Sequence, residues 1–76
     1  MRELILYIVR ELVDTPDQVE VKEVDGERSS ILELRVADED RGKVIGKEGR
    51  IIKSIRTLVN AASAKRDKRV TVEIIE

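Results

Sequence analysis

The feature that most constrains this chain is the stretch covering residues 41–52, which reads R-G-K-V-I-G-K-E-G-R-I-I. At its centre two glycines, Gly46 and Gly49, flank two charged residues. Because glycine has no Cβ and tolerates positive φ, such a pair lets a tight turn come close to a ligand backbone. The aliphatic pairs before and after the glycines are expected to bury on the core side. The stretch therefore predicts a charged loop that points outward between two helices.

Apolar residues with helical spacing predict two longer helices around this loop. The first covers residues 2–14, and Pro16 stops it. Its apolar stripe consists of Leu4, Ile5, Ile8, Val9, Leu12 and Val13. The second covers residues 50–65 and has the stripe Ile51, Ile52, Ile55, Leu58, Val59 and Ala62. A short helix, capped by Asp38, is expected to end at Gly46.

Alternating apolar residues predict three strands, over residues 18–24, 30–37 and 70–75. A turn at residues 25–26, Asp-Gly, joins the first two strands as a hairpin. Val24 breaks the alternation of the first strand, so a bulge or the end of the strand is expected near Glu23.

The composition disfavours most catalytic chemistry. The 76 residues include no cysteine and no histidine, so thiolate catalysis and the commonest metal ligand and general base are missing. No apolar stretch reaches the length of about 18 residues typical of a membrane span. Charged residues interrupt the N-terminal apolar residues, which argues against a signal peptide. We therefore expect one cytoplasmic domain over residues 1–76, with no metal, no cofactor, no membrane contact and no small-molecule substrate.

The net charge of -1 conceals a strong asymmetry along the chain. Residues 1–40 carry five Lys/Arg and twelve Asp/Glu, whereas residues 41–69 carry ten Lys/Arg and two Asp/Glu. Charge separated by segment in this way predicts one basic face that attracts polyanions. The basic turn at residues 65–69 either extends a nucleic-acid path or only solubilises a helix C-terminus, where cations are favoured anyway.

The loop and the order of elements resemble the K-homology (KH) domain, a module whose G-x-x-G loop clamps the backbone of about four nucleotides. The matching positions are Val44, Ile45 and Gly46 at the end of the first helix, Lys47 and Glu48 at the tip, and Gly49, Arg50 and Ile52 at the start of the second helix. The length, the N-terminal helix and the preceding R-G-K are similar to the small bacterial stand-alone KH proteins, the KhpA family. The resemblance covers essentially the whole chain.

The resemblance implies an α+β fold of the type II KH arrangement, in which a helix and a strand precede the strand-helix-helix-strand core. The order is then helix, strand, strand, helix, G-x-x-G, helix, strand. The strand over residues 70–75 should lie beside the strand over residues 30–37 in a three-stranded mixed sheet, with all three helices covering one face.

The resemblance also implies that the loop binds single-stranded RNA. Lys47 offers an ammonium group to a phosphate, and the glycines let the backbone approach the strand. Glu48 repels a phosphate at short range, so it is expected to turn away and pair with Lys47 or Arg50. The alternative is a plain helix-turn-helix corner in which the glycines only permit a tight turn.

A groove between the first KH helix and the second strand is expected to hold the bases. Its basic rim would consist of Arg41, Lys43, Arg50, Lys53 and Arg56. Its apolar floor would draw on Val44, Ile45, Ile52 and either Leu34 or Val36, unless these side chains serve only the core. The chain lacks Phe and Trp, so aromatic stacking is missing and the affinity should be modest and salt-sensitive.

The resemblance implies a bacterial RNA chaperone and post-transcriptional regulator. It would act as a homodimer or with a larger KH-containing, Jag-like partner (KhpB), in a family linked to cell shape and peptidoglycan homeostasis. One alternative is a protein-interaction module that keeps the KH shape without binding RNA. A nucleotide-processing enzyme is disfavoured because G-x-x-x-x-G-K-[ST] is absent. The residues alone do not separate RNA from DNA.

Overall fold

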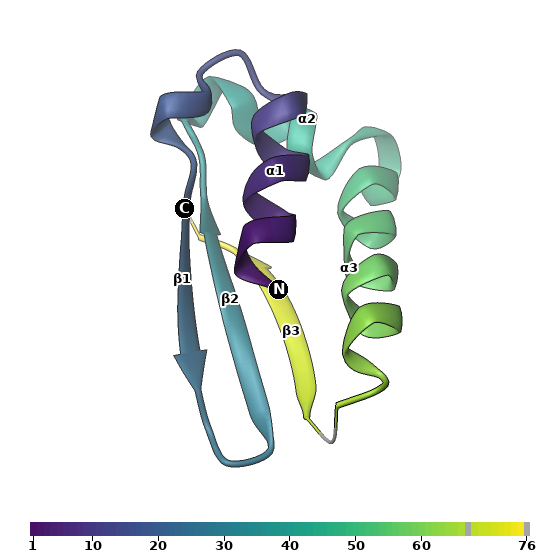
Figure 1. The fold of residues 1–76 in the computed structure, drawn as a ribbon. Coiled ribbons are helices and arrows are strands. Elements are labelled where there is room, and N and C mark those ends of the chain that lie inside the picture. Colours follow the sequence, from purple (N-terminus) through teal and green to yellow (C-terminus); the bar gives the residue numbers. More distant parts are fainter. Residues whose placement is uncertain (67, 76) are drawn as a thin grey trace.

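The computed structural model describes residues 1–66 and 68–75. The helices and strands, in chain order, are α1 Arg2–Leu12, β1 Glu20–Asp25, β2 Ser29–Arg35, α2 Arg41–Ile45, α3 Arg50–Ser63 and β3 Arg69–Ile74 (Figure 1). Short 3-10 turns at Pro16–Gln18, Asp38–Asp40 and Lys47–Gly49 lie between them. The expected order of elements is confirmed. No helix in the described part of the chain combines the length and hydrophobicity needed to cross a lipid bilayer.

The sheet has the order β1-β2-β3 and is mixed, as expected. β1 pairs with β2 in antiparallel fashion, with Val21 opposite Leu34, and β2 pairs with β3 in parallel, with Leu32 opposite Val72. These four side chains point inward and are buried. The helices cover this inner face, and the predicted α+β fold is confirmed (Figure 1).

The core is formed by all three helices and the inner face of the sheet. Its most completely buried side chains come from α1, β2, α2, α3 and β3, namely Ile5, Val9, Leu32, Leu34, Val44, Val59 and Val72. Burying aliphatic side chains is worth about 1.5–3 kcal/mol each, so these contacts set how the helices lie on the sheet.

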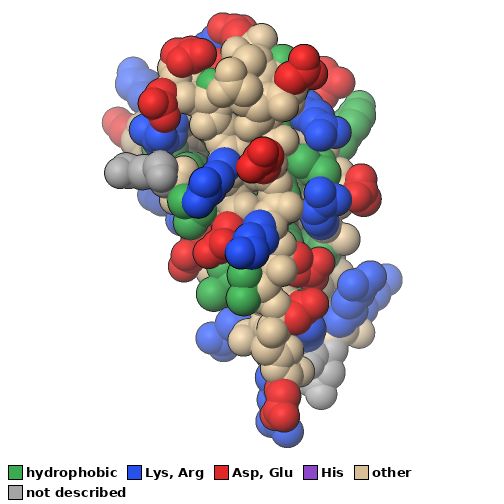
Figure 2. Space-filling view, turned by 90° about the vertical axis from the view of Figure 1, so that its left-hand side faces the viewer, with side chains coloured by type: hydrophobic (Ala, Val, Ile, Leu, Met, Phe, Trp, Pro, Cys, Tyr) green, Lys and Arg blue, Asp and Glu red, His purple; other side chains and the backbone are tan. Residues whose placement is uncertain are grey.

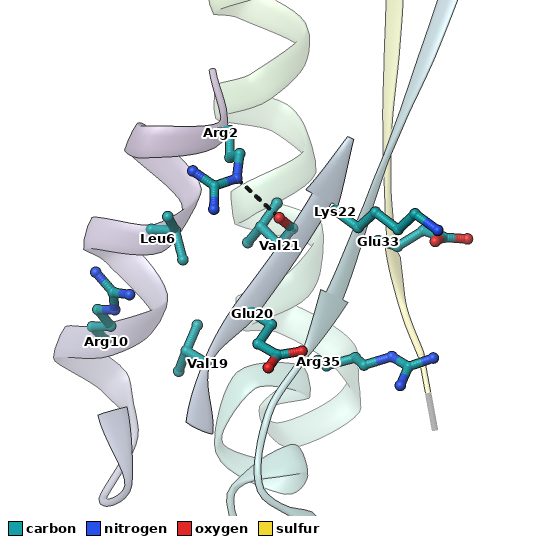
Figure 3. Close-up of a pocket in the computed structure, with 9 residues that line it drawn as sticks. All are labelled: Arg2, Leu6, Arg10, Val19, Glu20, Val21, Lys22, Glu33 and Arg35. Carbon is teal, nitrogen blue, oxygen red and sulfur yellow. Dashed lines mark hydrogen bonds between the residues drawn. The ribbon is translucent and has the colours of Figure 1, made fainter. Parts of the chain in front are cut away.

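The expected helical stripes are wrong at four positions. Leu6 is buried although it lies off the expected α1 stripe, whereas Leu4 is 40% exposed. The cause is the position of α1 at the edge of the sheet, where Leu6 faces Val19 and Val21 (Figure 3). On α3, Leu58 is 52% exposed and Ala62 is also exposed.

The bulge or early strand end expected near Glu23 does not occur. β1 continues in regular pairing to Asp25, and Val24 lies opposite Ile31 on the outer face of the sheet. The inward position at the end of β1 is therefore occupied by a carboxylate. Asp25 is satisfied there, because its Oδ1 accepts hydrogen bonds from the Ser30 hydroxyl and, at 2.9 Å, from Lys68 Nζ.

Two acidic residues before α2 are hydrogen-bonded within the protein, and the cap expected at Asp38 does not form through its side chain. Asp38 does not cap a helix through its side chain, which instead accepts a hydrogen bond of 2.7 Å from Arg41 Nη2. Asp40 is 0% exposed, and its two carboxylate oxygens accept hydrogen bonds from the backbone amides of Asp14 at 3.2 Å and Thr15 at 3.0 Å. Asp40 thus fastens the segment after α1 to the start of α2.

Replacing Asp40 by Asn should destabilise the protein. The change removes the charge and one of the two acceptor oxygens from a buried site, and hydrogen bonds of this kind contribute about 1.5–3 kcal/mol each. Urea denaturation of Asp40→Asn should therefore show a free energy of unfolding lower by about 1–3 kcal/mol. Asp38→Asn, at an exposed ion pair, is the matched control and should unfold almost like the original protein. Equal losses in both variants would contradict the assigned role of Asp40.

Candidate nucleic-acid interface

The loop between α2 and α3 has a left-handed backbone over most of its length. The φ angles are 78° at Gly46, 57° at Glu48 and 72° at Gly49. The Gly46 amide donates to the Gly42 carbonyl at 2.9 Å, and the Gly49 amide donates to the Gly46 carbonyl at 3.1 Å. The loop is therefore a closed, hydrogen-bonded turn, and Glu48 holds a conformation that costs a non-glycine residue about 1–2 kcal/mol.

The two glycines are needed for different reasons. A Cβ added at Gly46 would lie 2.6 Å from Cγ1 of Ile51 and 2.9 Å from its Cβ, closer than carbon atoms can pack. A Cβ at Gly49 would meet nothing nearer than 4.0 Å. Gly46 therefore permits close packing of the loop against α3, whereas Gly49 supplies only the positive φ that begins the helix.

The tip of the loop carries opposite charges on exposed side chains. Lys47 and Glu48 are both exposed, and Glu48 Oε2 lies 3.6 Å from Arg50 Nη2. This contact confirms that Glu48 pairs with Arg50, one of the two expected partners. An exposed pair of this kind is weak, so Arg50 can still interact with another anion.

Arg41 and Lys43 are engaged by carboxylates of the protein itself. Arg41 pairs with Asp38 and its side chain is only 26% exposed. Lys43 hydrogen-bonds to Asp14, and that contact raises the pKa of Lys43. These two cations therefore stabilise the surroundings of α2, and they are less available to a ligand than the exposed Arg50 and Lys53.

The cations of the expected rim that lie on α3 are Arg50, Lys53 and Arg56, and they lie near different parts of the structure. Lys53 lies beside the loop, since its Cε would be 4.0 Å from a Cβ at Gly49. Arg56 reaches β3, where its Nε donates to the Val72 carbonyl at 3.2 Å. Arg50 and Lys53 therefore lie near the loop, and Arg56 belongs to a groove farther along α3.

That groove lies between α3 and β3 and has a volume of about 370 Å³. Its lining residues are Arg56, Val59, Asn60, Arg69, Val70, Thr71 and Val72. None of these residues is acidic. Arg69 belongs to the basic turn at residues 65–69, for which an extended nucleic-acid path was one of the two expectations. Asn60 and Thr71 were missed in the sequence, although Asn60 lies one helical turn after Arg56 and could have been found from that spacing.

The apolar floor expected for a groove between α2 and β2 is mostly buried. β2 is the central strand, and its inward residue Leu34 is 0% exposed beneath the helices. Val44 is also 0% exposed and Ile52 is 6% exposed, so both support the core and offer almost no surface to a ligand. Ile45 is half-buried beside the loop. Among the aliphatic candidates on the two KH helices, it is the residue that offers surface to a ligand.

Alanine substitutions at the three glycines of this region should change the free energy of unfolding by different amounts. Gly46→Ala should lower the free energy of unfolding by at least about 1–3 kcal/mol, because it adds the contact with Ile51 to an unfavourable backbone. Gly49→Ala should cost about 1–2 kcal/mol for the backbone alone. Gly42→Ala lies in α2 with nothing within 4 Å and should stabilise by about 0.5–1 kcal/mol. Urea denaturation checks the order, and a Gly46→Ala variant as stable as Gly42→Ala would contradict it.

Comparison with known proteins agrees with this geometry. A family model described as the KH domain of KhpA/KhpB matches residues 2–74. The RNA-binding protein KhpA of Clostridium acetobutylicum is 61% identical over 75 residues, which cover 99% of this chain and 100% of that protein. The protein of the same name from Borreliella burgdorferi is 51% identical over 74 residues, covering 97% of this chain and 90% of that protein.

A third relative, the RNA-binding protein KhpA of Chlamydia trachomatis, is 50% identical over 76 residues, covering 100% of this chain and 97% of that protein. The family is not one of enzymes, which agrees with the absence of cysteine and histidine from the sequence. Because the matches extend over almost the whole chain at these identities, the chain belongs to the KhpA/KhpB KH-domain family.

Proposed function

We propose that the protein binds single-stranded RNA, without catalysis, through the loop at residues 46–49 and the groove between α3 and β3. The observation that carries the proposal is the loop itself: a closed turn with positive φ at three of its four residues, facing outward before a helix of 14 residues. The relatives named RNA-binding protein favour RNA over DNA as the ligand.

The loop suits a phosphate for three physical reasons. Without Cβ atoms at its two glycines, the backbone can approach a sugar-phosphate chain closely. The N-terminus of α3 presents the positive end of the helix dipole. The side chains of Lys47, Arg50 and Lys53 are exposed around it and supply positive charge. Together they form a cationic site that recognises a backbone rather than a base sequence.

The groove offers a path for the nucleotides that follow. Arg56 and Arg69 provide positive charge. Half-buried Val70 offers apolar surface, whereas Val59 and Val72 are 1% exposed and belong to the core. Asn60 and Thr71 can exchange hydrogen bonds with base edges or with the 2′-hydroxyl groups that distinguish RNA. No aromatic side chain lines this groove, so binding should depend on phosphate contacts and weaken strongly with salt.

The more detailed functions follow from the resemblance and are part of the proposal. They are RNA chaperone activity and post-transcriptional regulation in the cytoplasm, a role in cell shape and peptidoglycan homeostasis, and pairing with a second copy or with a KhpB-like protein. Pairing has some support on the surface of α3, where Leu58 is 52% exposed. The same exposed residue supports the competing proposal, a protein-interaction module that does not bind RNA.

A double substitution in the loop tests RNA binding directly. Lys47→Asp combined with Glu48→Asp replaces the cation at the tip and should weaken binding to a labelled oligouridylate by about tenfold, equivalent to 1.4 kcal/mol. Fluorescence anisotropy measures the affinity. Arg10→Asp combined with Glu11→Asp makes the same change on α1 and serves as the matched control. A folded loop variant with unchanged affinity would defeat the proposal and favour the protein-interaction module.

Removing the carboxylate from the tip should have the opposite effect. Asn adopts the left-handed conformation more readily than most residues, so Glu48→Asn should keep the loop intact while removing the repulsion of a phosphate. We expect affinity for the same oligouridylate to rise about two- to fivefold, the range of an exposed charge interaction. Weaker or unchanged binding, with an unchanged melting temperature, would show that Glu48 points away from the bound strand.

A further inference from the structure

We propose that the hairpin end of the molecule holds a second phosphate-binding site for the same RNA strand, formed by Arg28, Lys68 and Arg69. This inference rests on the proposed RNA binding and extends it from the loop to the opposite end of α3. The site would hold the backbone of nucleotides beyond those clamped at the loop.

The site is a hollow where the turn between β1 and β2 meets the beginning of β3. It has a volume of about 370 Å³ and is lined by Arg28, Ser29, Lys68 and Arg69. The backbone fixes this meeting point, because the Arg69 amide donates to the Arg28 carbonyl at 2.9 Å. Three of the four lining side chains are cationic. The hydrogen bond between Arg69 and Arg28 keeps the two chain segments that carry them close together.

A hydrogen-bonded carboxylate holds one of these cations in place. Lys68 Nζ donates to Asp25 Oδ1 at 2.9 Å, and the Ser30 hydroxyl donates to the same oxygen. These contacts, that from Ser30 first, lower the pKa of Asp25, so its carboxylate stays ionised and partly offsets the charge of Lys68. Over residues 1–66 and 68–75, no carboxylate forms an ion pair with Arg28 or Arg69. These two guanidinium groups supply the binding charge.

Arg69 connects this hollow to the groove of the proposed RNA site. It lines both the groove between α3 and β3 and the hollow at the hairpin. The loop precedes α3 and the hollow follows its C-terminus, so the helix separates them by about 21 Å at 1.5 Å per residue. The two sites thus lie at opposite ends of the molecule (Figure 1). An RNA strand that leaves the loop and follows the groove therefore reaches Arg69 first and then Arg28.

The cleft on the opposite side of the molecule does not suit a polyanion equally well. It is larger, at about 620 Å³, and lies between α1 and β1 (Figure 3). Its cations are accompanied by two carboxylates, Glu20 and Glu33, which lie opposite Arg35 and Lys22 across the two strands. The face seen from the β1 side likewise mixes acidic and basic side chains (Figure 2). By contrast, the groove between α3 and β3 and the hollow at the hairpin have no carboxylate among their lining residues.

The test compares two lengths of oligouridylate. The short one has about four nucleotides, enough for the loop, and the long one has about three times that number. Arg28→Glu should bind the short oligonucleotide like the original protein and the long one about three- to tenfold more weakly. For the long one, the slope of log affinity against log salt should fall by about 0.7 in magnitude, the value for one lost phosphate contact. The milder Arg28→Gln should show the same pattern, and thermal melting confirms that both variants fold.

Arg10→Glu is the matched control, because it makes the same charge change on α1 outside the proposed path. Equal weakening by Arg28→Glu and Arg10→Glu would overturn the second site and indicate a general effect of net charge. No weakening by Arg28→Glu, or equal weakening for both lengths, would overturn it too. In all these cases the original protein still binds RNA. If the original protein binds neither oligonucleotide, the proposed function itself fails and the second site with it.

Discussion

The close contact between Gly46 and Ile51 is the constraint on which the site depends. Because a Cβ at Gly46 would lie 2.6 Å from Ile51 Cγ1, the chain can turn from α2 into α3 only where this residue lacks a side chain. Ile51 thereby lies against the loop while its neighbour Ile52 enters the core. Ile51 thus packs against the core side of the loop, and the charged side chains at the tip point outward.

Carboxylates then divide the cations of this region into two groups. Asp38 and Asp14 pair with Arg41 and Lys43, so the charges on α2 are used within the protein. Those on α3 and at the start of β3 face the groove or the loop. Buried Asp40 supports this division, because it ties the segment after α1 to the beginning of α2 and so brings Asp14 close to Lys43. The basic surface is therefore shaped by acidic residues from the other half of the chain.

The sequence predicted the features that depend on local patterns. The order of elements and the position of the loop follow from spacing and turn chemistry, and the structure confirms them. Features that depend on contacts between distant segments were missed. Leu6 is buried because α1 lies at the sheet edge, and Asp40 is buried because amides 26 and 25 residues away in the chain approach it. A groove between α2 and β2 would have a buried floor, because β2 is the central strand and Leu34 is 0% exposed.

In the proposed complex, a single-stranded RNA lies on the loop and continues along α3 and β3. An NMR titration of isotopically labelled protein with an oligouridylate tests it most directly, since each backbone amide reports its own surroundings. If RNA follows this path, chemical-shift changes should appear at residues 46–50, at Arg56 and Asn60, and at residues 69–72, with little change on α1. Shift changes concentrated on α1 and β1, with the loop unaffected, would contradict it.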